Sequence, residues 1–252
     1  MATYRVLLKR LMRIGDLIGN GRRGSATAGH LWRPIALAAC IAPLTFALGA
    51  CGGGGETVRL GIVGEPGVQV HERPRGALRT TLGSITEFGS PRVLPVVERQ
   101  DGWLGIIAPE LGNGKIGWVK RRTAPLTFDK TNRSIHVDLS ERRVELRKGG
   151  STIHDFEVTV GAFATKTPKG EFAVTDVLTE DINPVYGCCV VGLSARQPNL
   201  PPGWLGGDRV GIHGWSGPVG RAESAGCLRA KNRDMRKFIS GLKLGTPVTI
   251  KQ

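Results

Sequence analysis

Short apolar segments separated by glycine and proline constrain the fold of this chain more than any other feature. Segments such as "VRLGIV", "GWLGIIA", "GEFAVTDVL" and "TPVTIK" alternate apolar with other residues, as half-buried strands do. The chain of 252 residues contains 37 glycines and 15 prolines, many of them in turns such as "VGEPG" and "LGNGK". A helix is predicted only for residues 232–242, where Met235, Phe238 and Leu242 recur three and four positions apart. We therefore expect a mainly β fold with one late helix.

Residues 1–50 have the composition of an export signal. Seven Arg and Lys residues and one Asp precede or flank the uncharged stretch "PIALAACIAPLTFALGA". Its end, "LGAC", matches the lipobox of bacterial lipoproteins, in which the cysteine (here Cys51) is acylated and becomes the mature N-terminus. Residues 51–57 are glycine-rich and suit a flexible tether. We predict a lipoprotein that is exported to the cell envelope and anchored in a membrane; a conventional cleaved signal and an uncleaved anchor are the alternatives.

Residues 58–125 form a first group of predicted strands. The stretch "DGWLGIIAPELGNGKIGWVKR" resembles the last strands of bacterial SH3-like domains, with Trp103 and Trp118 at the corresponding places. The resemblance implies a small SH3-like β-barrel that binds peptides or cell-wall material; alternatively, both tryptophans are packing residues. Residues 123–132 are polar and turn-rich, so we predict a linker there, before a second β-rich domain over residues 132–252.

Charge and cysteine content narrow the possible partners. The formal net charge is +14, which favours binding to polyanions. The sequence contains no basic helical stripe and no aromatic–basic motif of an RNA-binding sheet. Anionic wall polymers or lipid head groups are therefore the expected partners, and nucleic acid is not.

Three cysteines lie beyond the predicted signal and lipobox: Cys188, Cys189 and Cys227. Adjacent cysteines rarely bridge each other, and a free Cys227 has a candidate partner in His213.

The stretch "GIHGWSGPVGRAESAGCLR", residues 211–229, contains the candidate chemistry. A thiol becomes a strong nucleophile when an imidazole accepts its proton, giving a thiolate–imidazolium pair. Gly226 allows backbone amides to approach a reacting carbonyl, and the carbonyl of Gly214 is a candidate partner for the second ring nitrogen of His213. A buried thiol with a packed histidine, or two metal ligands, are the alternatives. Metal is disfavoured because no C-x-x-C or H-x-x-x-H cluster occurs nearby.

The same stretch, with "TPKGEFAV" at residues 167–174, resembles the L,D-transpeptidase catalytic domain of the YkuD type. The family's pattern is an HG pair, a variable loop, Ser/Thr-His-Gly-Cys, a hydrophobic residue and Asn or Arg. The resemblance implies that Cys227 is the nucleophile, that His213 is the base and that the backbone of Gly226 and Cys227 forms an oxyanion hole. Arg229, Ser224 and Tyr186 are the candidate substrate-binding residues. Arg229 would orient a stem carboxylate or is a solvated surface arginine, Tyr186 would line the entrance or packs, and Ser224 is expected to shape the turn. Ala225 departs from the pattern, because it replaces the second histidine.

The resemblance further implies acyl transfer without a cofactor. The thiol would attack a peptidoglycan stem tetrapeptide, release D-alanine and pass the acyl group to an amine of a neighbouring stem. Carbapenem-type β-lactams are expected to acylate the same thiol. Two alternatives remain open: an L,D-carboxypeptidase or cross-link hydrolase that uses the same Cys–His site, and a non-catalytic wall-binding lipoprotein.

Overall fold

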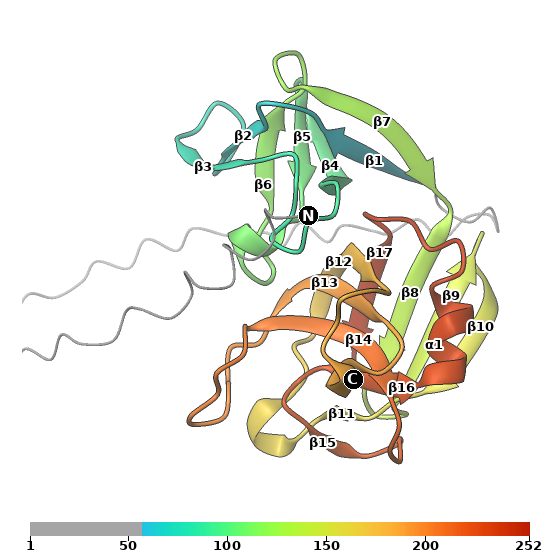
Figure 1. Ribbon diagram of the computed structural model, residues 1–252. Helices are drawn as coiled ribbons and strands as arrows, with labels where there is room; N and C mark the ends of the chain where they lie inside the picture. Colours follow the sequence, from blue (N-terminus) through green and yellow to red (C-terminus); the bar gives the residue numbers. More distant parts are fainter. Residues whose placement is uncertain (1–56) are drawn as a thin grey trace, which may run out of the picture. The chain divides into compact units, whose positions relative to one another are not determined.

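The computed structural model describes residues 57–252, which form two large β-sheets and one small one (Figure 1). The strands of the first sheet are β1 Val58–Val63, β2 Val68–His71, β3 Leu78–Leu82, β4 Val93–Gln100, β5 Trp103–Ile106, β6 Gly117–Lys120 and β7 Leu126–Thr131. They are hydrogen-bonded in the order β3-β2-β6-β5-β4-β1-β7, and every pairing is antiparallel. The prediction of a mainly β chain is confirmed.

The first sheet has its own hydrophobic core. Alternate residues of its strands are buried, among them Val68, Val70 and Ile106, as expected for strands with one face turned inward. Trp103 and Trp118 are 7% and 9% exposed, which favours packing over an open ligand groove. The resemblance to SH3-like domains stays a prediction.

The predicted linker is wrong, because β7 occupies most of it. This strand pairs with β1 along its whole length, from Leu126 opposite Val63 to Thr131 opposite Val58. This strand lies at the edge of the sheet, and only Thr131 of its six residues is buried. Its sequence therefore lacks the apolar alternation that identifies a half-buried strand. Backbone pairing, which leaves little trace in side-chain polarity, determines this element. The strands β2 and β3 were also absent from the sequence-based prediction.

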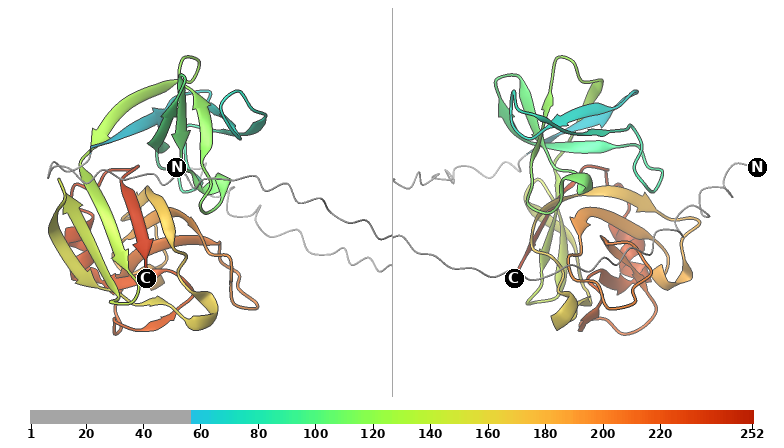
Figure 2. Two further views of the ribbon diagram at one scale, coloured as in Figure 1. Left: turned by 180° about the vertical axis from the view of Figure 1, so that it is seen from behind. Right: turned by 90° about the vertical axis from the view of Figure 1, so that its left-hand side faces the viewer.

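The second sheet follows directly and contains eight strands. They are β8 Arg133–Asp138, β9 Arg143–Lys148, β10 Ser151–Glu157, β12 Gly170–Leu178, β13 Val190–Arg196, β14 Arg209–Trp215, β16 Leu228–Lys231 and β17 Pro247–Lys251. Their order is β10-β9-β8-β17-β12-β13-β14-β16. Two pairings, β17 with β8 and β14 with β16, are parallel, and the others are antiparallel (Figure 2). The small sheet pairs β11 Val160–Gly161 with β15 Ala222–Ser224.

One α-helix, α1 Asn232–Phe238, lies in residues 57–252, besides the short 3₁₀ helices η2 Pro109–Leu111, η3 Phe163–Thr165 and η4 Pro184–Tyr186. Met235 and Phe238 are fully buried, and the Phe238 ring meets Phe156 of β10 edge-on at 5.2 Å. The helix is shorter than predicted. A turn follows it, with Gly241 at φ +68°, and Leu242 packs against the core from that turn.

The predicted export signal (1–50), the lipidation site Cys51 and nearly all of the tether lie outside the described residues. In residues 57–252, no helix has the length and apolar character needed to span a bilayer.

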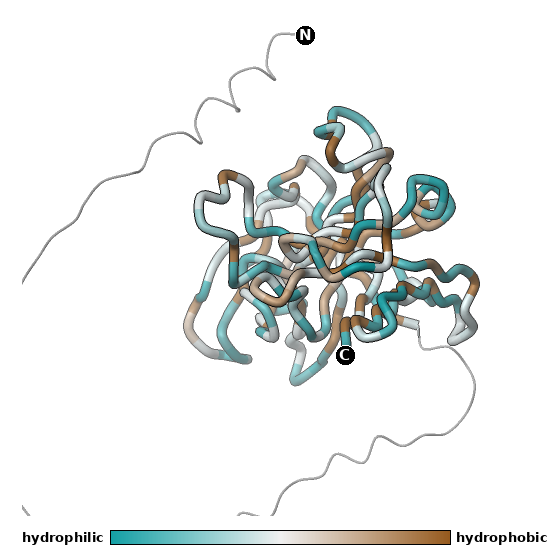
Figure 3. The backbone as a smooth tube through the Cα atoms, turned by 90° about the horizontal axis from the view of Figure 1, so that it is seen from below, coloured by the Kyte–Doolittle hydropathy of each residue, from teal (hydrophilic) through white to brown (hydrophobic). Residues whose placement is uncertain are grey.

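Figure 3 colours the chain by hydropathy: hydrophobic stretches concentrate toward the middle of the view, and most peripheral loops are hydrophilic. The buried set of the second sheet contains Ile212 and Leu228, on the strands that present the candidate site.

Candidate active site

The two reactive side chains lie on neighbouring strands. In the parallel pair β14–β16, Ile212 is opposite Leu228 and His213 is opposite Arg229. Because side chains alternate along a strand, His213, Arg229 and Cys227 face one side, while Ile212 and Leu228 are buried on the other. Cys227 and His213 accordingly line the same two pockets. Cys227 lies directly before β16, which begins at Leu228.

The parallel pairing also explains the distance between the two motifs in the sequence. Parallel neighbours need a connection of roughly a dozen residues or more, whereas antiparallel neighbours need only a tight turn. The connection between Trp215 and Leu228 includes β15, which pairs with β11. The loop that separates histidine from cysteine is therefore a structural requirement of this arrangement.

His213 is held in one orientation and is neutral. Its Nδ1 donates to the backbone oxygen of Gly214 at 2.8 Å, as the sequence suggested, which leaves Nε2 to accept a proton. The ring is 3% exposed and meets the Tyr186 ring edge-on at 5.0 Å. Burial, the largest cause, and the charge of Arg229 together lower the pKa of His213 to about 4, against the opposing effect of the bond to Gly214.

The Cys227 thiol is partly buried and protonated. Burial raises its pKa, although the backbone N–H of Gly211 and the charge of Arg229 favour the thiolate. Its closest hydrogen-bond acceptor is the backbone oxygen of Arg209, at 3.9 Å. The resting pair is thus a thiol beside a neutral imidazole, and the thiolate–imidazolium pair expected from the sequence is not its resting state. The low polarity of the buried site disfavours both charged forms.

The turn that carries the thiol is fixed from within by Ser224. Its Oγ accepts a hydrogen bond from the N–H of Gly226 at 3.1 Å and donates one to the oxygen of Cys227 at 2.6 Å. Ser224 is 2% exposed, so its hydroxyl shapes the turn, as the sequence predicted, and is not free for the substrate contact that was its other predicted role. The Gly226 N–H is likewise occupied. The Cys227 N–H has no acceptor among the described residues, so of the predicted pair it alone stays a candidate oxyanion donor.

Three buried polar side chains hold the same turn from outside. Thr165 donates to the oxygen of Ser224 at 2.8 Å, Thr167 to that of Gly226 at 2.9 Å, and Gln197 to that of Ala225 at 3.2 Å. Sequence reasoning assigned no role to any of these three. Thr167 belongs to the quoted "TPKG" stretch, but Gln197 follows β13 and carries no local signal of its function.

Gly226 has a specific steric requirement at this turn. Its φ is +119°, a backbone conformation that residues with a Cβ rarely adopt. A Cβ at this position would lie 2.0 Å from the Nε2 atom of Gln197. Glycine is therefore required both by the backbone and by the amide packed against it.

Two pockets meet at the thiol. The first, of about 110 Å³, is lined by Trp204, Trp215 and Arg229 in addition to the reactive pair. The Arg229 guanidinium lies 4.4 Å above the Trp215 ring and forms none of the ion pairs found in residues 57–252, so it is available to an anion. The second, of about 230 Å³, is lined by residues that include Phe88 and Asp181. Tyr186 lies between them and lines both.

The remaining cysteines have structural positions. Cys188, Cys189 and Cys227 are all free. Burial raises the pKa of Cys189 to about 12, and the backbone N–H of Cys188 donates to the side chain of Asn232 at 2.9 Å.

In the part of the chain that the structure describes, no cluster of three or more His, Cys, Asp or Glu residues is placed to hold a metal ion.

Comparison with known proteins points to the same segment. Residues 132–250 match the model of the YkuD family, the L,D-transpeptidase catalytic domain. The YkuD protein of Bacillus licheniformis is 32% identical over 118 residues, which are 46% of this chain and 64% of that protein. Its Bacillus subtilis counterpart is 29% identical over the same shares of both chains. The chain thus spans less than two thirds of the curated relatives it matches.

Solved structures were compared as well. A crystal structure of a mutant of the Enterococcus faecium L,D-transpeptidase aligns with 21% identity and a TM-score of 0.37, covering 47% of this chain and 49% of that one. The Bdellovibrio bacteriovorus protein Bd1075 aligns with 24% identity and a TM-score of 0.39, covering 48% of each. By the family and sequence matches, residues 132–250, which contain His213 and Cys227, are similar to the L,D-transpeptidase catalytic domain.

Proposed function

We propose that this protein is a peptidoglycan L,D-transpeptidase that works through a cysteine acyl-enzyme. The observation that carries the proposal is the placement of Cys227 and His213 on one face of neighbouring strands, at the junction of two pockets. The similarity of residues 132–250 to the L,D-transpeptidase catalytic domain supports the choice of substrate.

In the first half-reaction, the thiol attacks the carbonyl carbon that joins the third stem residue to the terminal D-alanine. The sulfur–carbon bond forms as the thiol proton passes to Nε2 of His213. The Cys227 N–H stabilises the oxyanion, and the carbon–nitrogen bond then breaks. The proton returns from His213 to the departing amine, which leaves as D-alanine. Arg229, which has no ion-pair partner among residues 57–252, orients a carboxylate of the donor stem.

In the second half-reaction, an acceptor amine attacks the thioester. The amine gives one proton to His213, the new amide bond forms, the carbon–sulfur bond breaks, and the sulfur recovers the proton. A neutral imidazole with a pKa of about 4 is in the base form at neutral pH, as both halves require. Water in place of the amine would give a carboxypeptidase or hydrolase. Two pockets that share one thiol favour transfer, because donor and acceptor then have separate approaches.

The reaction products on defined stem peptides test this proposal. Dimers joined between two third-position residues, together with free D-alanine, are expected from transfer, whereas tripeptides alone would indicate hydrolysis. Cys227→Ser should abolish D-alanine release and the covalent mass adduct with a carbapenem. Cys188→Ser, which alters a free thiol outside both pockets, should retain them. If the wild-type protein forms no adduct and releases no D-alanine, the chain is a non-catalytic wall-binding protein.

The cell envelope is the proposed location, since peptidoglycan lies outside the cytoplasmic membrane. A lipid anchor at Cys51 would keep the enzyme near it, and the net charge of +14 would favour anionic wall polymers. Labelling with a radioactive fatty acid, in the intact protein and in Cys51→Ala, tests the anchor.

A further inference from the structure

The first sheet contributes a wall to the second pocket. The connection between β3 and β4 carries Phe88, and this side chain lines the pocket together with Tyr186, His213 and Cys227. Phe88 is 47% exposed, so it does not belong to the core of its own sheet. A residue outside the segment that matches the L,D-transpeptidase domain therefore faces the reactive thiol.

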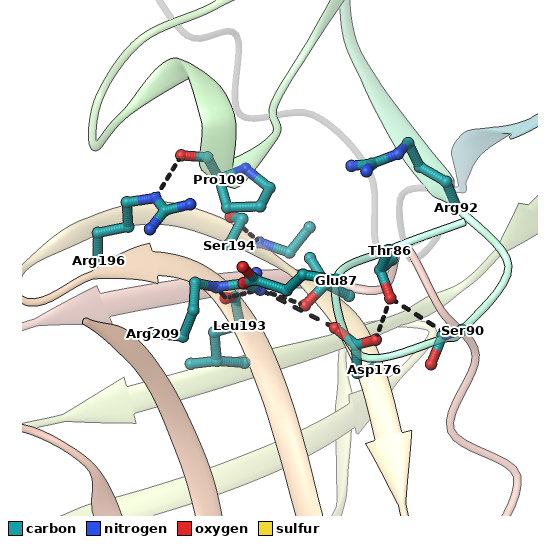
Figure 4. A network of polar contacts seen from close by, with 12 residues as sticks. Thr86, Glu87, Ser90, Arg92, Pro109, Asp176, Leu193, Ser194, Arg196 and Arg209 are labelled. Atoms are coloured by element: carbon teal, nitrogen blue, oxygen red, sulfur yellow. Dashed lines mark hydrogen bonds and ion pairs between the residues drawn. The ribbon is translucent and has the colours of Figure 1, made fainter. Parts of the chain in front are cut away.

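The connection is held in place by polar contacts with the second sheet (Figure 4). The Thr86 hydroxyl donates to Oδ1 of Asp176 at 2.5 Å, and its Oγ accepts from the Ser90 N–H at 3.1 Å. Arg209 of β14 forms an ion pair with Glu87, and its guanidinium lies 5.5 Å from the centre of the Phe88 ring. These contacts position Phe88 above the strand that carries His213.

Arg209 contributes little free charge to the pocket. Its Nη2 lies 4.0 Å from Oδ2 of Asp176, a fully buried carboxylate oxygen with no hydrogen-bond partner among the described residues. The same guanidinium donates to Thr175 and to the backbone oxygen of Leu193, both at 2.6 Å. Two acidic groups and two neutral acceptors thus satisfy it.

The two pockets differ in the charged side chain that has no ion-pair partner. The first presents Arg229, which has no acidic partner, while the second presents Asp181, which has no basic partner among the ion pairs of the described residues. Phe88 and Ile182 supply apolar surface beside Asp181. Such a pocket is complementary to a cation on an aliphatic stem, such as the side-chain amine of a peptide.

We infer that this second pocket is the acceptor site and that Phe88 of the first sheet determines how well the acceptor amine is bound. The inference rests on the proposed function. Asp181 attracts the ammonium, and the methylene groups of the acceptor side chain pack on Phe88. The ammonium releases one proton to solvent, and the neutral amine then attacks the thioester and gives its second proton to His213. The anionic donor occupies the first pocket, beside Arg229.

A partition experiment tests the inference. A stem tetrapeptide serves as donor, and a stem tripeptide with a free side-chain amine serves as acceptor, because it lacks the D-alanine needed to donate. The first-turnover burst of D-alanine reports acylation, and the dependence of dimer formation on tripeptide concentration reports acceptor binding. For Phe88→Ala we expect the acceptor KM to rise about tenfold, with a change of less than threefold in the burst rate.

Two further variants sharpen the result. Asp181→Asn removes only the charge, since asparagine tolerates the φ of +53° at this position, and should raise the acceptor KM several-fold at low salt and less at high salt. Phe128→Ala, a partly exposed phenylalanine of the same sheet outside both pockets, is the matched control and should leave the acceptor KM unaltered.

Each outcome is decisive. An unchanged acceptor KM in folded Phe88→Ala overturns the inference, and so does an equal loss in burst rate and dimer formation, which would make the second pocket a donor site. Should Phe88→Ala fail to fold, Phe88→Leu together with Asp181→Asn gives the same comparison. A wild-type enzyme that releases D-alanine but forms no dimer overturns the acceptor site and makes the protein a hydrolase that uses the same Cys–His site. Absence of D-alanine release refutes the proposed function instead.

Discussion

The thiol lies between two walls that are held by different kinds of contact. The turn at residues 224–227 is fixed by neutral hydrogen bonds among buried groups, notably Ser224, Thr167 and Gln197. The β3–β4 connection on the other side is fixed largely by charged contacts, of which the Arg209–Glu87 pair is partly exposed. Neutral buried hydrogen bonds are insensitive to salt, whereas exposed ion pairs are weak and screened. The nucleophile is therefore rigidly placed, and the opposite wall is the more adjustable one.

Gly226→Ala should have the largest effect, because it forces a Cβ to within 2.0 Å of Gln197 at a φ of +119°. Displacement of the thiol and of the Cys227 N–H should slow acylation by about 100- to 1,000-fold, as expected for a misplaced nucleophile and oxyanion donor. The burst of D-alanine measures it. Gly83→Ala, where a Cβ meets nothing within 4 Å, is the control. A normal burst in Gly226→Ala would mean that the turn is not rigid.

The neutral state of His213 should make folding stability depend on pH. Its pKa is 6.5 in an unfolded chain and about 4 in the folded protein, so on acidification the unfolded state takes up the proton first. The neutral His213 side chain therefore makes its full contribution to the free energy of unfolding above pH 6.5. This contribution decreases as the pH falls toward 4, and the total loss is about 3 kcal/mol at most. Chemical denaturation of wild type and His213→Asn across this range isolates it. Parallel curves for the two proteins would show that the pKa of His213 is the same in the folded and unfolded states.

Gln197→Ala should have an intermediate effect. The two Nε2 hydrogens are shared among the backbone oxygens of Thr165, Lys166 and Ala225, and alanine leaves these oxygens without this partner. We expect about 1–3 kcal/mol of lost stability and roughly tenfold slower acylation, with little change in the acceptor KM. Thermal unfolding and the D-alanine burst measure the two effects. Gln100→Ala, at the exposed end of β4, is the control, and equal behaviour of the two variants would contradict the role of Gln197.

Glu87→Gln should have the smallest effect, because the ion pair with Arg209 is partly exposed. We expect a two- to threefold rise in acceptor KM at low salt that disappears in 0.5 M salt, since screening already weakens the pair in wild type. Glu141→Gln, in an exposed turn, is the matched control. A larger effect that persists at high salt would show that both walls are equally rigid.

Local pattern predicted part of the fold and much of the site. The bounds of β1 and β12 could be read from alternation, and the apolar spacing of Met235 and Phe238 identified α1. The local pattern did not identify β7, because the side chains of this strand are mostly exposed and give no sign of its backbone pairing with β1. At the site, the Gly214 contact of His213 was foreseen because it is local. Gln197 and Phe88 were not foreseen, because each reaches the site from a distant part of the chain.

The sequence by itself determined the mainly β character of the chain and singled out the candidate thiol and imidazole, since both depend on residue type and short-range spacing. Only the tertiary structure decided that β14 and β16 pair in parallel, which sets Cys227 and His213 on one face. It also decided that the resting pair is neutral and that a phenylalanine from the first sheet faces the thiol. Burial and strand register arise from contacts between segments far apart in the chain, and no local pattern encodes them.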